Sequence, residues 1–162
     1  MRARRVIVVG ASGILAPAAI ALRDRGDAVT AVARTRPLPA GVAGLHVDAT
    51  SADELGAALG EERWDVALVY APAVTDASVA RLRDAVDGRL VLVQTTAAVD
   101  PARVGDGEPA VPGDVLQLGW HDEASGSARW HGPTEISVAA LEVLADGEGR
   151  VLGSIRPWGR RP

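Results

Sequence analysis

The sequence predicts an α/β protein built on a doubly wound parallel β-sheet. Stretches rich in Val, Ile and Leu alternate with helical patterns, the first stretch runs into a glycine-rich turn, and no internal repeat or linker divides the chain. Strands that alternate with helices are joined by right-handed crossovers and pair in parallel. We expect one domain over residues 1–162, with the strand order 3-2-1-4-5-6 and a seventh strand if the C-terminal tail pairs.

Each strand is predicted from an apolar run. Residues 4–10 form a continuous β-branched run, typical of a strand buried on both faces. The later strands are predicted at 27–34, 45–50, 64–72, 89–96 and 114–121, and residues 150–158 form a last strand or an extended tail.

The helices are predicted from 3.6-residue spacing and from their end signals. The spacing over 12–26 ends at Gly26, a suitable C-terminal cap. Residues 51–62 open with S-x-x-E, a capping box, and 133–146 open with a proline, whose missing N–H costs nothing there. A further helix is predicted at 75–87, and loops at 37–44, 99–113 and 121–132.

Composition excludes several classes of protein. The net charge of −4 favours neither nucleic acid nor a membrane surface as a partner. The absence of cysteine excludes disulfides, iron–sulfur clusters and thiol catalysis. The apolar run after the N-terminal arginines is too short for a signal peptide or a transmembrane helix, so we expect a cytoplasmic protein.

The turn after the first strand has the pattern G-x-x-G-x-x-A, from Gly10 to Ala16. Gly10 permits a tight turn, Gly13 permits close approach of a pyrophosphate, and Ala16 permits close packing of the helix on the sheet. The start of the helix offers N–H groups and a positive dipole end to phosphates. We therefore predict cofactor contacts from Gly10, Ser12, Gly13, Ile14 and Leu15.

The end of the second strand predicts which nucleotide binds. An NAD site usually has an acidic residue there, but the chain reads Arg34-Thr35-Arg36. Arginine can pair with a 2′-phosphate, so these three residues predict NADP(H). Asp48, after the third strand, could accept the adenine amino group or could be a turn residue. Further cofactor contacts are predicted at the other strand ends, from Ala49, Ala71, Pro72, Thr95, Gly119 and Trp120.

The first hundred residues resemble the short-chain dehydrogenases/reductases, a superfamily of Rossmann-fold enzymes. The similar stretches are GASGILA, VARTR, VDATS, VYAPA and RLVLVQTTAAV, and the C-terminal RWHGPTEISVAALEVLA and VLGSIRPW resemble the end of compact members. The resemblance implies a nicotinamide-dependent oxidoreductase, with Thr96 at the position of the catalytic serine. It also suggests a place in bacterial specialised metabolism.

The chain departs from that superfamily in its acid. Members of the superfamily use a tyrosine followed four residues later by a lysine, on the helix after the fifth strand. This chain has no Lys and no Asn, its one tyrosine is Tyr70 on the fourth predicted strand, and segment 99–113 is too short for that helix. The usual Tyr–Lys mechanism is therefore impossible here, while cofactor binding is unaffected.

Other residues could supply the proton. His121 and His131 follow the carboxyl end of the sheet, and histidine is a competent acid or base near neutral pH. We take His121 as the first candidate donor and Thr96 as the holder of the reacting heteroatom; both histidines could equally be ordinary loop residues. Tyr70 could donate a proton or pack against the cofactor. The acidic neighbours able to orient a histidine are Asp122, Glu123 and Glu135, and Trp120 and Trp130 could wall the pocket. The spacing of these groups fits no familiar zinc pattern, so we predict no metal site.

The leading prediction is an NADP(H)-dependent reductase of a small C=O, C=N or activated C=C compound, because hydride chemistry is supplied by the cofactor. One alternative is a cofactor-free cyclase or isomerase that uses His121 or His131, and another is a non-catalytic NADP(H)-binding sensor. We also expect a homo-oligomer, a dimer or tetramer. The apolar residues of the last helix would face the sheet or a second subunit: Ile136, Val138, Leu141 and Leu144.

Overall fold

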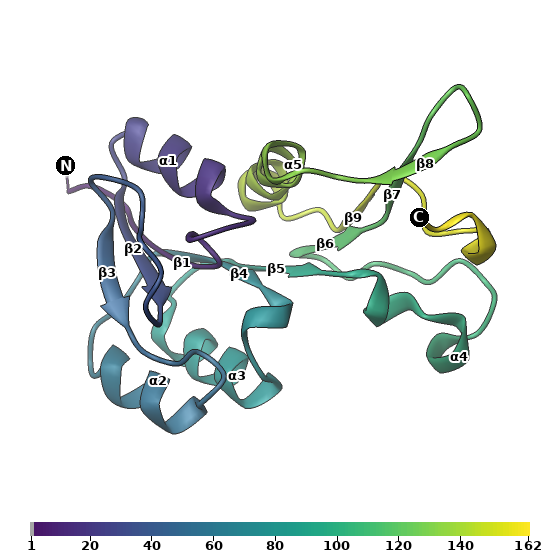
Figure 1. The fold of residues 1–162 in the computed structure, drawn as a ribbon. Coiled ribbons are helices and arrows are strands. Elements are labelled where there is room, and N and C mark those ends of the chain that lie inside the picture. Colours follow the sequence, from purple (N-terminus) through teal and green to yellow (C-terminus); the bar gives the residue numbers. More distant parts are fainter. Residues whose placement is uncertain (1) are drawn as a thin grey trace.

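A seven-stranded parallel sheet runs through the molecule in the computed structural model, which describes residues 2–162. The order is β3-β2-β1-β4-β5-β6-β9, so the predicted order and its seventh strand are both confirmed (Figure 1). Every neighbouring pair in this sheet is parallel. The strands are β1 (Arg5–Val9), β2 (Ala28–Ala33), β3 (Ala43–His46), β4 (Val66–Tyr70), β5 (Leu90–Gln94), β6 (Val115–Leu118) and β9 (Arg150–Leu152).

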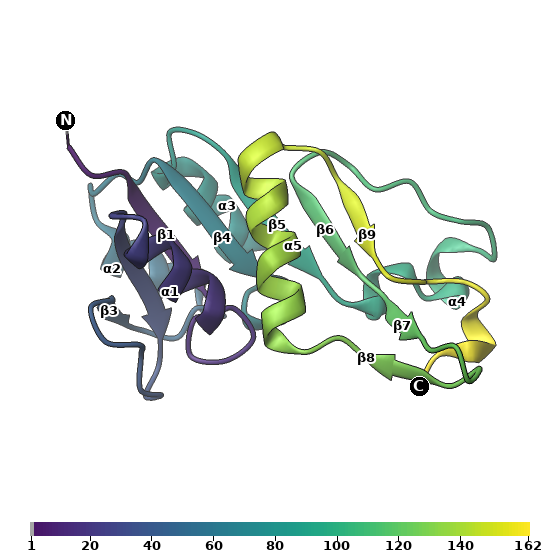
Figure 2. The ribbon, with the colours of Figure 1, turned by 90° about the horizontal axis from the view of Figure 1, so that it is seen from above.

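Helices cover both faces of the sheet, which makes it doubly wound. Helices α1 (Ala16–Asp24) and α5 (Pro133–Asp146) lie side by side on one face, and α2 (Ala52–Leu59) and α3 (Asp76–Ala85) lie on the other (Figures 1 and 2). The remaining helical segments are short: η1 (Ala71–Ala73), η2 (Thr96–Val99), α4 (Pro101–Val104) and η3 (Trp158–Arg160). Among the described residues, no helix is both long and apolar enough to cross a membrane.

The central strand β1 shows why the chain folds this way. Its side chains alternate between the two faces, with Val6 and Val8 packed in the core beneath α1 and α5, and Ile7 and Val9 in the core above α2 and α3. All four are essentially inaccessible to solvent, as expected for a β-branched run in a central strand. Since Val9 is in register with the ends of β2 and β4, the chain after β1 emerges between those two strand ends.

Helix α1 begins one turn later than predicted. The prediction of helix from residue 12 is wrong, because residues 12–15 form turns and Ala16 is the first helical residue. The N–H groups of Gly13 and Leu15 both donate to the Gly10 carbonyl, at 3.1 and 3.0 Å, and this closes a loop instead of a helical turn. The predicted helix end is close to the observed one, since Gly26 follows the C-terminus with a φ of +92°.

Side-chain caps hold the starts of α2 and α3. The Ser51 hydroxyl accepts the Glu54 N–H at 3.2 Å, which is one half of the predicted capping box, while the Ser51 N–H donates to the Asp48 carbonyl instead of to Glu54. The Thr75 hydroxyl accepts the Ser78 N–H at 3.1 Å. Helix α5 begins after Gly132 with Pro133 in its first turn, also as predicted. Its residues Ile136 and Leu144 are buried against the sheet and α1, whereas Val138 is 54% exposed.

Three other predictions are wrong in detail. The third strand occupies 43–46 and not 45–50, because the chain after Val47 bends into a turn closed by the Asp48 side chain. Segment 99–113 contains the four-residue α4, which Asp100 caps. The predicted polar loop 121–132 is mostly an antiparallel hairpin of β7 (Trp120–Asp122) and β8 (Ala128–Trp130). Its charged residues interrupt the apolar alternation by which a strand is recognised in a sequence. Of the tail, only the three residues of β9 form a strand.

Candidate functional site

The glycine-rich loop after β1 is a tight turn shaped by its glycines and by internal hydrogen bonds. Gly10 has a φ of +113°, and a Cβ atom added to it would lie 2.9 Å from the Cβ of Tyr70. Within residues 2–162, the N–H groups of Ser12 and Ile14 have no hydrogen-bond acceptor, so both can donate to a ligand. The Leu15 side chain is fully buried and its N–H is used by Gly10, so Leu15 shapes the loop from beneath.

A cavity of about 370 Å³ opens on the β2 side of this loop. Its volume lies within the usual range for small-molecule sites. The cavity brings together the predicted cofactor residues Gly10, Ser12, Arg34, Thr35, Arg36, Asp48 and Ala49, together with Val9, Val32, Ala33, Val47, Thr50 and Ala73.

Two arginines border this cavity without strong partners. Arg34 is largely exposed and comes no closer than 4.0 Å to the Asp48 carboxylate. In the part of the chain that the structure describes, Arg36 makes no ion pair. Its guanidinium lies close to the glycine-rich loop, 4.0 Å from where a Cβ of Gly13 would stand. Both cations can therefore turn toward an anion that lies between β2 and the glycine-rich loop.

Asp48 combines a turn role with a place in the cavity wall. Its Oδ1 atom accepts the Thr50 hydroxyl at 2.6 Å and the Thr50 N–H at 2.9 Å. These two hydrogen bonds, with a smaller contribution from Arg34, lower the pKa of Asp48, so the group is a carboxylate at neutral pH. Its Oδ2 atom is bound only weakly, by Arg34 at 4.0 Å.

A second cavity, of about 300 Å³, lies on the other side of the loop at the ends of β4, β5 and β6. It brings together three of the four predicted catalytic residues, Tyr70, Thr96 and His131, and three predicted cofactor residues, Ile14, Thr95 and Gly119. Leu118, Trp130 and Ile136 complete its lining. The two cavities therefore flank the glycine-rich loop, one beyond β2 and β3 and one beyond β4 to β6.

His131 is held firmly in the wall of this second cavity. Its side chain is 4% exposed, and its Nδ1 atom lies 3.1 Å from Oε2 of Glu135, one helical turn further on. Glu135 also accepts from Arg129 at 2.8 Å and from the Gly132 N–H at 3.3 Å. The Arg129 bond, then those from His131 and Gly132, lower the pKa of Glu135 to about 2. The carboxylate is therefore ionised, and Nδ1 of His131 carries the proton that it accepts.

The Nε2 atom of His131 is buried and has no hydrogen-bond partner within residues 2–162. It lies 2.5 Å from the position of a Cβ built on Gly153, a residue with a φ of +79°. An unpartnered ring nitrogen in a cavity wall is unusual, because a buried polar atom without a partner is costly. A glycine with a positive φ lets the backbone after β9 pass close to the imidazole.

The structure places His121, the first candidate donor, outside the cavity. It is exposed on β7, and its ring stands edge-on to His131 with the centroids 6.0 Å apart. The hairpin reverses the chain between the two histidines, so only His131 reaches the cavity wall. The geometry therefore favours His131 over His121.

Five predicted cofactor residues line neither cavity: Gly13 and Leu15 of the glycine-rich loop, and Ala71, Pro72 and Trp120. Trp120 is fully buried and packs edge-on against Trp158 at 6.3 Å, so its ring is a core group that no ligand can reach. Ala71 and Pro72 are the first two residues of η1, and the residues on either side of them, Tyr70 and Ala73, line the cavities instead.

The sequence did not single out Thr50, Ala73, Leu118 and Ile136 as lining residues. The sequence predicts Leu118 and Ile136 to be core residues of a strand and a helix, and their neighbours in the sequence do not indicate a ligand. Glu135 was named from the sequence as an acid able to orient a histidine, and in the structure it contacts Nδ1 of His131 and accepts the Gly132 N–H.

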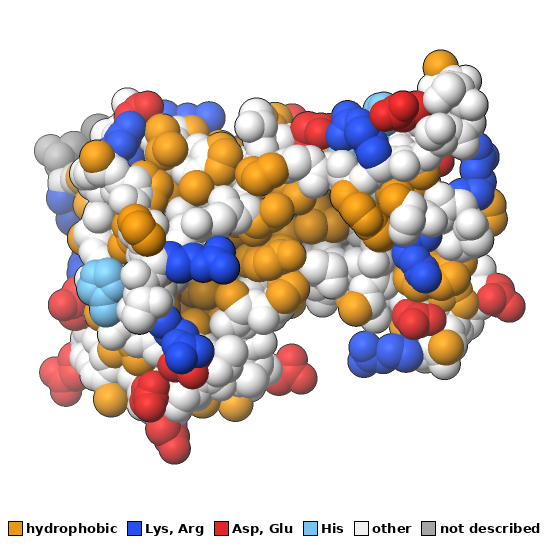
Figure 3. All heavy atoms as spheres, in the orientation of Figure 1, with side chains coloured by type: hydrophobic (Ala, Val, Ile, Leu, Met, Phe, Trp, Pro, Cys, Tyr) orange, Lys and Arg blue, Asp and Glu red, His pale blue; other side chains and the backbone are white. Residues whose placement is uncertain are grey.

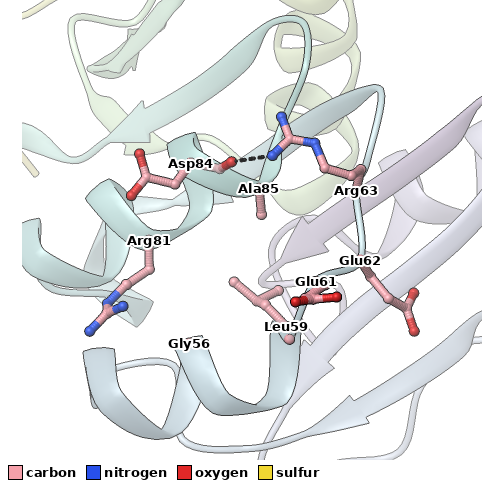
Figure 4. Close-up of a pocket in the computed structure, with 9 residues that line it drawn as sticks. Gly56, Leu59, Glu61, Glu62, Arg63, Arg81, Asp84 and Ala85 are labelled. Carbon is pink, nitrogen blue, oxygen red and sulfur yellow. Dashed lines mark hydrogen bonds between the residues drawn. The ribbon is translucent and has the colours of Figure 1, made fainter.

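A third cavity, of about 140 Å³, lies between the C-terminal ends of α2 and α3 (Figure 4). Its residues directly precede β4 and β5, so it lies at the amino edge of the sheet, away from the glycine-rich loop. Arg63 donates there to the Asp84 carbonyl at 2.6 Å. In residues 2–162, no three His, Asp or Glu side chains converge in a way that could hold a metal ion.

Comparison with known proteins finds no matching family model and no significant match among curated sequences. Solved structures do match. A short-chain dehydrogenase from Streptomyces avermitilis aligns over 94% of this chain and 89% of its own, with 16% identity and a TM-score of 0.61. The fold is that of the short-chain dehydrogenases/reductases.

Two more structures with this fold carry a nucleotide. A carbonyl reductase from Pseudomonas aeruginosa in complex with NADP aligns over 93% of this chain and 96% of its own, with 20% identity and a TM-score of 0.56. A wide-type short-chain dehydrogenase/reductase from Veillonella parvula in complex with NADP aligns over 99% of both chains, with 13% identity and a TM-score of 0.62. An NADH-dependent reductase complexed with NAD also has this fold, with 13% identity and a TM-score of 0.64.

Proposed function

We propose that this protein is an NADP(H)-dependent reductase of a small molecule. The observation that carries the proposal is the pair of cavities on either side of the glycine-rich loop. A dinucleotide is an elongated ligand with a pyrophosphate in its middle, and helix N-termini are suited to that group. The unpaired N–H groups of Ser12 and Ile14 lie between the two cavities, where a pyrophosphate would sit.

The β2-side cavity fits an adenosine that carries a 2′-phosphate. Arg34 and Arg36 border it, and no acidic residue stands at the end of β2 to bind the ribose hydroxyls of NAD. Each guanidinium can donate two hydrogen bonds to a phosphate, and neither has to leave a strong ion pair to do so. Oδ2 of Asp48 is available as an acceptor for the adenine amino group.

The second cavity fits the nicotinamide and the substrate. When bound, the cofactor would supply the hydride, and the protein would place the acceptor and deliver a proton. Tyr70 and Thr96 bring hydroxyl groups to this cavity, and neither hydroxyl has a hydrogen-bond partner within residues 2–162. Either can donate to a substrate oxygen or nitrogen.

His131 is the group in this cavity best suited to exchange a proton near neutral pH. The Glu135 carboxylate accepts the Nδ1 proton and orients the ring, so Nε2 is the ring nitrogen left for proton transfer. Because Nε2 packs against Gly153, proton delivery to the cavity needs a small movement of the ring or of the backbone after β9. The missing Tyr–Lys pair would thus be replaced by a hydroxyl and a carboxylate-bound histidine.

Calorimetric titration with NADPH and with NADH tests the proposal. We expect micromolar binding of NADPH and binding of NADH that is at least tenfold weaker, which corresponds to about 1.4 kcal/mol. Protein that binds NADPH should then oxidise it when a carbonyl or imine acceptor is added. Absence of binding of either nucleotide would contradict the proposal.

A further inference from the structure

The cavity at the ends of β4, β5 and β6 has uncharged walls. In the described residues, no Arg, Asp or Glu side chain lines it. Ile136 and Leu118 form a buried floor, and half-buried Ile14 adds an apolar side from the glycine-rich loop. The lining residues with polar side-chain groups are Tyr70, Thr95, Thr96, Trp130 and His131, none of which is a carboxylate or a guanidinium. This surface offers hydrogen bonds but no cation for an anionic substrate.

The charged groups next to His131 already neutralise one another. Glu135 is bound by Arg129 at 2.8 Å and by His131 at 3.1 Å, and Arg129 also lies 3.5 Å from Glu123. Arg129 is therefore committed to two carboxylates. An anion that entered the cavity would lose water without gaining a cationic partner, and such burial is costly.

Trp130 gives the cavity an aromatic face at its entrance. It stands at the end of β8 and is 48% exposed, although it is one of the largest apolar side chains in the protein. An exposed indole beside a cavity can stack on a flat ligand. On the face of the molecule drawn in Figure 3, hydrophobic side chains gather across the middle, and arginines border them on the side of β2 and β3.

We propose that the substrate of this cavity is a small, uncharged compound whose carbonyl or imine group is conjugated or aromatic. This inference rests on the proposed reductase function. The substrate would share about 300 Å³ with a nicotinamide ring, which favours a small molecule. The bound cofactor would supply the hydride for the new C–H bond as the C=O or C=N π bond breaks, and NADPH would become NADP⁺. The heteroatom would take its proton from His131 or from a hydroxyl of the cavity, and water would restore the proton to that group.

A matched pair of ketones tests the charge and shape of the substrate. Equilibrium dialysis would measure the binding of p-methylacetophenone and of p-acetylbenzoate, which have nearly the same size but differ in charge, with and without NADP⁺. We expect the neutral ketone to bind at least tenfold more tightly. Equal or tighter binding of the carboxylate, or no binding of the neutral ketone to protein that binds NADP⁺, would overturn the inference. Failure of NADP⁺ itself to bind would instead count against the proposed function.

A change of charge at the entrance gives a sharper test. Trp130→Arg adds a cation where the aromatic face stands, so it should tighten the binding of p-acetylbenzoate about tenfold and weaken that of p-methylacetophenone. Val104→Arg is the matched control, because Val104 is 49% exposed and lines neither of the two proposed ligand cavities. If both variants tighten carboxylate binding equally, the effect is one of overall charge and the inference fails.

Discussion

The Cβ of Tyr70 lies 2.9 Å from the point where a Cβ of Gly10 would stand. This contact joins the two halves of the candidate site, because Gly10 belongs to the glycine-rich loop and Tyr70 lines the second cavity. The positive φ of Gly10, at +113°, separately excludes most side chains. The loop can therefore keep its shape only with glycine at this position.

Gly10→Ala should destabilise the protein and abolish nucleotide binding. The backbone strain costs about 1–2 kcal/mol, and the clash with Tyr70 adds about 1–3 kcal/mol of overpacking. Gly26→Ala is the matched control, since Gly26 also has a positive φ but a Cβ there would touch nothing within 4 Å. Urea unfolding with an NADPH titration checks both variants, and equal effects would show that contact with Tyr70 is unimportant.

Arg34→Ala and Arg36→Ala should each weaken NADPH binding about tenfold while leaving NADH binding nearly unchanged. A charge-assisted hydrogen bond to a phosphate contributes about 1.5–3 kcal/mol, and only NADPH carries the 2′-phosphate. Arg25→Ala is the control, because Arg25 is an exposed arginine at the far end of α1. Calorimetry would contradict the assignment if the variants weakened NADH and NADPH binding by the same factor.

Glu135→Gln should lower stability at neutral pH and have little effect in acid. The folded protein lowers the pKa of Glu135 from 4.5 to about 2 through Arg129, His131 and Gly132. A depressed pKa stabilises the fold above pH 4.5, and this stabilisation is lost as the pH falls toward 2. The difference in melting temperature between the two proteins should therefore shrink across that interval. A difference that does not depend on pH would mean that charge is not the cause.

Substitutions of the two histidines should separate their roles. His131→Gln should reduce the rate of NADPH oxidation by about 100-fold or more, the usual contribution of a general acid, with NADPH affinity kept. His121→Gln should leave the rate of NADPH oxidation within about twofold of the wild-type rate, because His121 lies outside the cavity. Thr96→Val should also slow the reaction. The assignment fails if His121→Gln is the slower of the two histidine variants.

Much of this architecture could be predicted from local patterns. The strand order follows from the alternation of strands and helices, and the glycine-rich turn identifies the ligand-binding edge because carboxyl ends of parallel strands meet there. Arg34 and Arg36 could be placed for the same reason. The three-residue strands of the hairpin could not, because their polar sequence shows no alternation.

The choice between His121 and His131 depended on that hairpin. Both residues follow the sixth strand along the chain. Because the chain reverses between β7 and β8, His121 lies exposed on β7 while His131 lies at the start of α5. Trp120 was misjudged for a similar reason, because its burial depends on Trp158, thirty-eight positions later in the chain. Contacts of this kind come from tertiary packing, which single-sequence patterns do not report.

The central claim is that one dinucleotide spans both cavities across the glycine-rich loop, and nuclear magnetic resonance tests it most directly. Titration of ¹⁵N-labelled protein with NADPH should shift the amide signals of Ser12 and Ile14 in the loop, Thr35 in the β2-side cavity, and Thr95 and Gly119 in the second cavity. All should follow one saturation curve, while Gly60 in the third cavity should not move. Shifts confined to one side of the loop, or to the third cavity, would contradict the claim.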